Sequence, residues 1–255
     1  MPNPTRTLAE ELRNYATYFS YHRTRMKVAK AGTTKAFAKL GDNLRVGFRT
    51  INQNNPYDIP VNEADNGAFK GTARTTWFNR VLAAGGGSGT PLRTALDDAG
   101  KYFQNTSAAG PYGPQSGSNQ LACRQNFAIL TTDGFWNQAW TDTIGNADGT
   151  DGPSIFNPRD NTNVVRYTPT DPFRDGPTAN YTSTLGDIAM HYWKNDLRTD
   201  LPNLVPATSG NPAFWQHMST YGVSIGLRGT LDQGTVADIT QDGRPRKAGV
   251  AVNWP

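Results

Sequence analysis

Apolar residues recur every three or four positions along the start of the chain. The recurring set is Leu8, Leu12, Tyr15, Phe19, His22, Met26, Ala29, Thr33, Phe37 and Leu40. This spacing places them on one face of an α-helix. Thr7 and Glu10 fit a capping box at the helix start, and Gly41 lies where a C-cap glycine belongs. The pattern therefore predicts one long helix, loosened around residues 32–34, in which His22 is a packed core residue rather than a metal ligand.

Strands and helices alternate in the rest of the chain. Residues 44–51 alternate apolar and polar side chains with period two, which predicts a half-buried strand. Residues 126–133 form a continuous apolar run, as in a strand covered on both faces, and residues 219–227 predict a third strand. Further helices are expected over 72–85, 90–103 and 183–197. Strands alternating with helices predict an α/β fold with parallel neighbouring strands.

Three long loops separate these elements, at about 52–71, 104–120 and 138–182. Loops of this length are uncommon and are usually functional or disordered. The last loop contains NADGTDG (residues 146–152), whose alternate oxygen-bearing side chains have the spacing of a calcium loop. The bidentate glutamate that completes such a loop is absent. Because Asp, Asn and Gly dominate turns for backbone reasons, plain turns are the preferred interpretation.

A carboxylate at the end of a buried strand is the first candidate for chemistry. Asp133 follows the 126–133 run and precedes Gly134, so it either binds a metal at the carboxyl end of the strand or caps the Asp-Gly turn. The glycine-rich stretch 85–91 lacks the lysine of a phosphate-binding loop. It instead presents Thr90 at a helix start, as N-cap or as a hard oxygen ligand. Two oxygens are too few for a metal site.

The residues directly after Asp133 are the next candidates. Phe135, Trp136 and Asn137 either pack the 138–182 loop or present an amphipathic surface to a partner, and loop packing is the favoured interpretation. The single cysteine, Cys123, is either a buried thiol or a half-cystine whose partner lies outside this chain.

Composition narrows the class of protein. The chain has 255 residues, enough for one large or two small domains. Its net charge of +4 comes from interspersed residues without a basic run, so nucleic acid is not an expected partner. No stretch approaches the roughly 18–20 apolar residues of a membrane span, and no signal peptide opens the chain. A Gly-x-Ser-x-Gly elbow is absent, and the three histidines lie far apart in the sequence, which argues against an enzyme.

An ordered run of sequence blocks resembles a known family. The blocks are NYATYFSYHRTRMKVAKAGTTKAFAKL, TPLRTALDDAGKYF, ACRQNFAILTTDGFWN, GNADGTDGP, TLGDIAMHYWKNDLR and NPAFWQHMSTYGVSIGLRGTL. Together they resemble the PilY/PilC-type tip adhesins of bacterial type IV pili over roughly Leu8–Leu231. The resemblance implies a von Willebrand factor A-like (Rossmann-like) fold: a doubly wound, mostly parallel sheet with long inserted loops and a metal-ion-dependent adhesion site at its top.

The resemblance also locates the residues of that adhesion site. Thr90 matches the family's threonine before the helix, and Asp133 matches the aspartate of its strand-turn. The family's Asp-x-Ser-x-Ser element is absent from this sequence. Residues 1–255 are therefore expected to be one von Willebrand factor A-like segment of a longer protein, lacking the first central strand. A divalent cation, Mg²⁺ or Ca²⁺, is expected in the full-length protein, with weak or no binding by this segment.

The function implied by the resemblance is non-enzymatic adhesion and type IV pilus biogenesis at the pilus tip. The implied partners are minor pilins and host-cell or abiotic surface receptors, without a direct membrane span. The implied location is the bacterial cell surface, at the pilus tip or outer membrane, where an oxidising environment favours Cys123 as a half-cystine. The alternative is a metal-dependent enzyme or a stand-alone carbohydrate-binding module that uses the Asp-rich and aromatic-rich loops.

Overall fold

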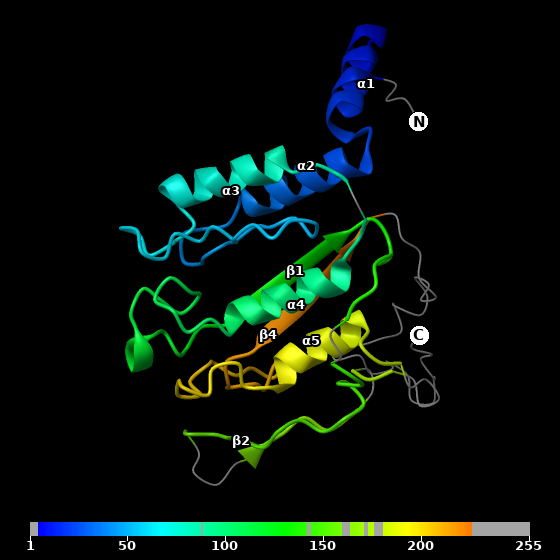
Figure 1. Cartoon of the computed structure of the whole chain (residues 1–255). Helices are drawn as coiled ribbons and strands as arrows, with labels where there is room; N and C mark the ends of the chain where they lie inside the picture. Colours follow the sequence, from blue (N-terminus) through cyan, green and yellow to red (C-terminus); the bar gives the residue numbers. More distant parts are fainter. Residues whose placement is uncertain are drawn as a thin grey trace. The chain divides into compact units, whose positions relative to one another are not determined.

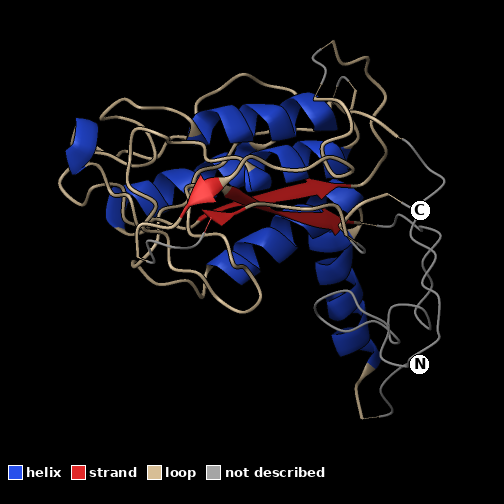
Figure 2. Cartoon of the chain, turned by 90° about the horizontal axis from the view of Figure 1, so that it is seen from below, coloured by secondary structure: helices blue, strands red, loops and turns tan. Residues whose placement is uncertain are grey.

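A computed structural model describes residues 5–87, 89–141, 144–159, 164–170, 173–175 and 181–225 (Figures 1 and 2). These residues form a mixed α/β protein with five α-helices and a small parallel sheet. The chain divides into two compact units. The first comprises Met1–Pro60 and Gly67–Ser88, and the second comprises Val61–Asn66 and Gly89–Pro255. The expectation of a single domain over 1–255 stays a prediction.

The first unit contains α1 (Leu8–His22), α2 (Arg25–Phe37) and α3 (Gly71–Ala83). The capping box predicted at Thr7 is confirmed, because the Thr7 hydroxyl accepts from the Glu10 amide at 3.3 Å and the Glu10 carboxylate accepts from the Thr7 amide at 2.8 Å. The prediction of a single long helix is wrong, because α1 and α2 are separate helices. Thr24 has an extended backbone, and its hydroxyl caps α2 by accepting from the Lys27 amide at 3.2 Å. The break therefore lies at a second N-cap rather than at residues 32–34.

Two further expectations for this region are wrong. Helix α2 ends at Phe37 with Ala38 as its C-cap, so Gly41 does not cap it. No residue of α1 is buried, and the side chains from Leu8 to Phe19 on its apolar stripe are exposed. His22 is only half-buried and is not a core residue.

The core of the first unit is aromatic and centres on α3. Trp77 stacks on Phe37 of α2, with ring centroids 4.6 Å apart, and meets Phe69 edge-on at 5.4 Å. The predicted strand over 44–51 is wrong, because among the described residues this segment forms no ladder. Its period-two pattern still has a physical basis: the apolar side chains of Leu44, Val46 and Phe48 pack against this core.

The second unit contains the parallel pair β1 (Asn126–Thr132) and β4 (Met218–Ser224), in register from Asn126↔Met218 to Thr132↔Ser224. Predicted strand residues 226–227 lie outside the described residues. Helices α4 (Leu92–Phe103) and α5 (Leu185–Lys194) lie side by side against this pair (Figure 1). Leu96 of α4 and Ile188 and Tyr192 of α5 form a buried cluster with Met218 of β4 and with Leu197, which follows α5.

Among the described residues, the sheet is covered on one face only, which corrects the expectation for residues 126–133. Alternate β1 side chains from Ala128 to Thr132 are half-buried. The intervening Phe127 and Ile129 are 51% and 54% exposed, and on β4 Tyr221 is 56% exposed. The structure therefore supports a mixed α/β protein with a small parallel sheet, while the doubly wound von Willebrand factor A-like sheet and its missing central strand stay predictions.

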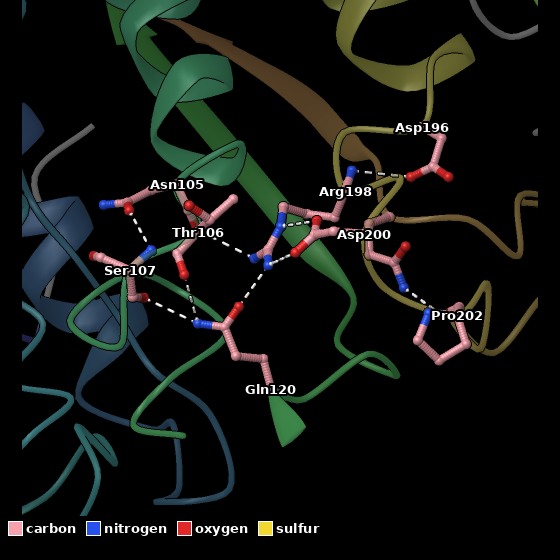
Figure 3. Close-up of polar contacts among 9 residues, drawn as sticks. Asn105, Thr106, Ser107, Gln120, Asp196, Arg198, Asp200 and Pro202 are labelled. Atoms are coloured by element: carbon pink, nitrogen blue, oxygen red, sulfur yellow. Dashed lines mark hydrogen bonds and ion pairs between the residues drawn. The ribbon is translucent and has the colours of Figure 1, made fainter. Parts of the chain in front are cut away.

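The described residues of the long loops form little regular structure (Figure 2). A 3₁₀ turn covers Gly117–Asn119, and β2 (Ile155–Phe156) pairs antiparallel with β3 (Val164–Val165). A buried arginine orders the 104–120 loop. Arg198 is 1% exposed and points toward Gln120 and Asp200 (Figure 3).

Each nitrogen of the Arg198 guanidinium donates a hydrogen bond. Nε donates to Asp200 at 2.8 Å, Nη2 donates to the Gln120 amide oxygen, and Nη1 donates to the Asn105 carbonyl at 3.2 Å. Its carbon lies 4.8 Å from the centre of the Tyr112 ring. One cation thus connects the 104–120 loop to the chain that follows α5.

Replacing Arg198 is expected to destabilise the second unit strongly. Arg198→Leu would strand the buried Gln120 oxygen and the Asn105 carbonyl, so we expect the free energy of unfolding to fall by about 3 kcal/mol. Urea denaturation with a two-state fit measures it. The control is Arg166→Leu, whose exposed ion pair with Asp151 (2.9 Å) is worth at most about 1 kcal/mol. Equal losses in the two variants would contradict the ordering role of Arg198.

Candidate functional site

The structure brings two sequence-predicted segments together at the carboxyl end of β1. The backbone amide of Thr90 donates to the side-chain oxygen of Asn137 at 2.7 Å. Gly89 makes this approach feasible, because its φ is +78° and an added Cβ would lie 2.6 Å from the Gln138 side-chain nitrogen. Thr90, half-buried, and Asp133, exposed, therefore belong to adjoining segments of one surface.

The turn after β1 is closed by a residue that the sequence analysis did not single out. The Thr132 hydroxyl accepts from the Gly134 amide at 3.1 Å and lies 2.8 Å from the Gly134 carbonyl, to which it donates. This is a local side-chain turn of the kind that Ser and Thr favour. The alternative role for Thr90 as N-cap is wrong, since α4 has Pro91 as its N-cap.

The arrangement does not make a complete metal site from this chain's described residues. Among them, no group of three or more His, Cys, Asp or Glu side chains is placed to hold a metal ion. Thr90 and Asp133 offer two oxygens, whereas Mg²⁺ and Ca²⁺ take six or more ligands. The weak metal binding expected of this segment stays a prediction.

Arg93 holds the beginning of the 138–182 loop and was missed by the sequence analysis. Its guanidinium donates to the carbonyls of Gln138 at 3.1 Å and Ser183 at 3.4 Å. It also lies 5.6 Å from the Trp136 ring centre and 5.8 Å from that of Trp140, within cation–π range. The only sequence signal was its place in the first turn of α4, one helix turn from the glycine-rich stretch.

The aromatic pair after Asp133 divides into two roles. Trp136 lies against Arg93, which fits the favoured loop-packing interpretation. Phe135 is 70% exposed and is the part of this surface that is most available to a partner. Cys123 is exposed, so the buried-thiol interpretation is wrong, and its pairing outside this chain stays a prediction.

A second polar site lies in the 146–152 loop. The turn interpretation is confirmed by the Asn146 side chain, which accepts from the Gly149 amide at 2.6 Å. The loop also encloses a cation from the protein itself. The Lys194 ammonium donates to the carbonyls of Ala147 at 2.6 Å and Thr150 at 2.8 Å, and to the Thr150 hydroxyl at 3.0 Å. Only the Thr150 hydroxyl among these oxygens belongs to the side chains with the spacing of a calcium loop, because the other two are backbone carbonyls.

Burial shifts the pKa values of several groups in the second unit. Desolvation lowers the pKa of the Lys194 ammonium, opposed by Asp148, Asp151 and Asp187. Desolvation likewise lowers the pKa values of His191 and His217, which favours neutral imidazoles. The His217 ring nitrogens lie 2.7 Å from the Trp215 carbonyl and 2.8 Å from the Asn211 amide nitrogen, so this histidine has a packing role.

The fold and site together define a mixed α/β protein whose candidate site lies at the carboxyl end of a parallel strand.

The chain is homologous to the type IV pilus biogenesis factor PilY1 over about nine-tenths of its length. It is 30% identical to PilY1 of Pseudomonas aeruginosa PAO1 over 253 residues, which cover 87% of this chain and 20% of that protein. With PilY1 of strain PAK it shares 30% identity over 281 residues, covering 97% of this chain and 22% of that protein.

A third relative, PilY1 of strain UCBPP-PA14, is 31% identical over 238 residues, covering 86% of this chain and 19% of that protein. The chain thus spans about a fifth of the length of the curated relatives it matches. No family model and no solved structure matches it. In the part of the chain that the structure describes, the helices are too short or too polar to cross a membrane.

The Asn137 side chain is expected to fix the Thr90 turn. Asn137→Ala removes the acceptor of the Thr90 amide, so we expect faster hydrogen exchange at that amide and a loss of about 1 kcal/mol of stability. Amide exchange followed by NMR measures the first effect, and urea denaturation measures the second. Asn55→Ala is the control, because the Asn55 side chain donates to the nearby exposed side chain of Gln53. Unchanged protection at Thr90 would show that the two segments are held together by other contacts.

Proposed function

We propose that this chain is a non-enzymatic adhesion and assembly module of a type IV pilus biogenesis protein, located at the pilus tip on the bacterial surface. The observation that carries the proposal is homology to PilY1 over about nine-tenths of the chain. The relatives are named as pilus biogenesis factors, and the chain matches only a fifth of them. The proposed role is therefore that of one portion of a longer protein.

The open sheet supports a larger von Willebrand factor A-like domain. Parallel strands are normally covered on both faces, because their crossover connections run over those faces. Here β1 and β4 leave Phe127, Ile129, Tyr221 and Val223 exposed on one face, and two strands rarely suffice for an independent sheet. We propose that further strands of the same polypeptide, including the missing central one, complete this sheet.

The proposed site is the surface that contains Thr90 and Asp133. In the completed domain these two residues supply two oxygens of a divalent cation site, and the remaining ligands come from the Asp-x-Ser-x-Ser element of the longer protein. Phe135, at 70% exposure, offers an apolar contact next to that site. Minor pilins and host-cell or abiotic surfaces are the proposed partners. The enzyme and carbohydrate-binding alternatives gain no specific support from the structure.

The exposed phenylalanine provides a test of adhesion that is separate from assembly. In bacteria that carry the full-length protein, Phe135→Ala is expected to leave surface piliation unchanged and to lower cell retention on glass under flow several-fold. Phe156→Ala, which removes an exposed phenylalanine from β2, is the control and is expected to change neither. Deletion of the whole segment is expected to abolish piliation. Normal piliation and normal retention after that deletion would overturn the proposed function.

Metal binding is tested on the isolated chain and on the full-length protein. Calorimetric titration with Mg²⁺ or Ca²⁺ is expected to show no micromolar binding to the chain, because two oxygen ligands leave the cation mostly hydrated. The full-length protein is expected to bind, and Asp133→Ala is expected to weaken that binding. A micromolar dissociation constant for the isolated chain would contradict the proposal that Thr90 and Asp133 supply only part of the metal site.

A further inference from the structure

Helix α5 holds the 146–152 loop at both of its ends. Asp187, in the first turn, accepts from the amides of Ala147 at 2.7 Å and Asp148 at 3.3 Å. Lys194, the last residue of the helix, donates to the carbonyls of Ala147 at 2.6 Å and Thr150 at 2.8 Å. The two side chains are about two helix turns apart, so they project from the same face. The amides of the loop therefore meet an anion, and its carbonyls meet a cation.

The contacts around the Lys194 nitrogen require a charged ammonium group. The carbonyls of Ala147 and Thr150 can only accept hydrogen bonds. The Thr150 hydroxyl donates its own proton to the Asn146 carbonyl at 2.8 Å, so it also accepts from Lys194, at 3.0 Å. Three acceptors need three N–H donors, which an ammonium has and a neutral amine does not. Because Lys194 is only 6% exposed, these oxygens replace most of the water around the ion.

The oxygens around this ammonium are those of a site for a monovalent cation. Beyond the two carbonyls and the hydroxyl, the next oxygen is a third carbonyl, that of Asp151, at 3.4 Å. Carbonyl oxygens carry no net charge and suit a monovalent cation, as in the filters of K⁺ channels, whereas protein sites for Ca²⁺ usually include carboxylates. The Asp151 carboxylate instead pairs with Arg166 at 2.9 Å. In the described part of the chain, no three acidic, His or Cys side chains are grouped to hold a metal ion.

We propose that the 146–152 loop forms a monovalent-cation site whose permanent occupant is the Lys194 ammonium. The lysine takes the place of a bound ion, so the loop is ordered without any metal. The site accepts a small alkylammonium ion from solution when the lysine side chain is shortened. It shares no residue with the Thr90–Asp133 surface, and chelation of divalent metal leaves this loop in place.

Shortening the lysine tests its role as the cation of the loop. Lys194→Ala leaves two buried carbonyls and a hydroxyl without their donor, so we expect the Tm of the full chain to fall by about 6 °C. We also expect faster hydrogen exchange at the amides of residues 147–151. The control is Lys30→Ala, whose exposed ammonium donates to one carbonyl, that of Leu82 at 2.6 Å. This variant is expected to lose about 2 °C at most.

Chemical rescue separates a cation site from general packing. The n-propylammonium ion replaces the three methylene groups and the ammonium that Lys194→Ala removes. Adding its chloride salt is expected to restore at least half of the lost Tm and the protection of residues 147–151, with no change in the wild type. Tetramethylammonium chloride is the matched control, because it has the same charge and no N–H donor. Equal effects of the two salts on a folded Lys194→Ala variant, or no effect of either, would overturn the proposal.

A second measurement uses the wild type and needs no variant. Hydrogen exchange of the amides of residues 147–151 is followed in EDTA and in excess Ca²⁺. We expect equal protection in the two solutions, because the ammonium already occupies the loop. Higher protection of these amides in Ca²⁺ would show that the loop binds a divalent ion, and the proposal would then be wrong. This result decides the question even if Lys194→Ala does not fold.

Discussion

Parallel pairing of β1 with β4 forces the chain between them to return across the sheet, because adjacent parallel strands cannot be joined by a hairpin. Helix α5 makes that return and packs Ile188 and Tyr192 against Met218 of β4. Helix α4 lies beside α5 on the same face (Figure 1). The Tyr192 hydroxyl reaches across to Asp97 at 2.6 Å, so a polar contact inside the apolar layer fixes how the two helices pair.

Buried charges, rather than regular secondary structure, order the long loops of the second unit. Asp187 at the start of α5 and Lys194 at its end both bind the backbone of the 146–152 loop. Arg198, just beyond the helix, binds the 104–120 loop through the Asn105 carbonyl and the Gln120 side chain. A buried ion needs several hydrogen bonds to offset its lost hydration, and loop carbonyls and amides are the groups with unused capacity. The hydration that each buried charge loses is thus offset by hydrogen bonds, and the same hydrogen bonds hold a loop in place.

The sequence predicted the elements whose signals are local. The apolar spacing of α4 and α5 and the apolar run of β1 placed each of them within a few residues. It missed the break at Thr24, because the apolar periodicity continues through that residue. A threonine that caps a helix also cannot be told by sequence alone from a threonine inside one. It wrongly predicted a strand at 44–51. An alternation of apolar and polar residues shows which way side chains point, but it does not show whether the backbone pairs with another strand. Lys194 and Ala147 lie 47 positions apart, so no local pattern could join them.

The candidate site is organised by contacts that do not depend on a complete sheet. Thr90 and Asn137 are joined through a backbone amide and a side-chain oxygen, and the Thr132 hydroxyl closes the adjacent turn. Both contacts lie at the carboxyl end of β1, the edge at which open α/β sheets bind their ligands. The face formed by Phe127 and Tyr221 is different, since its apolar side chains gain stability only when another layer covers them. The Thr90 and Asp133 segments are therefore held by contacts of their own, whether or not another layer covers Phe127 and Tyr221.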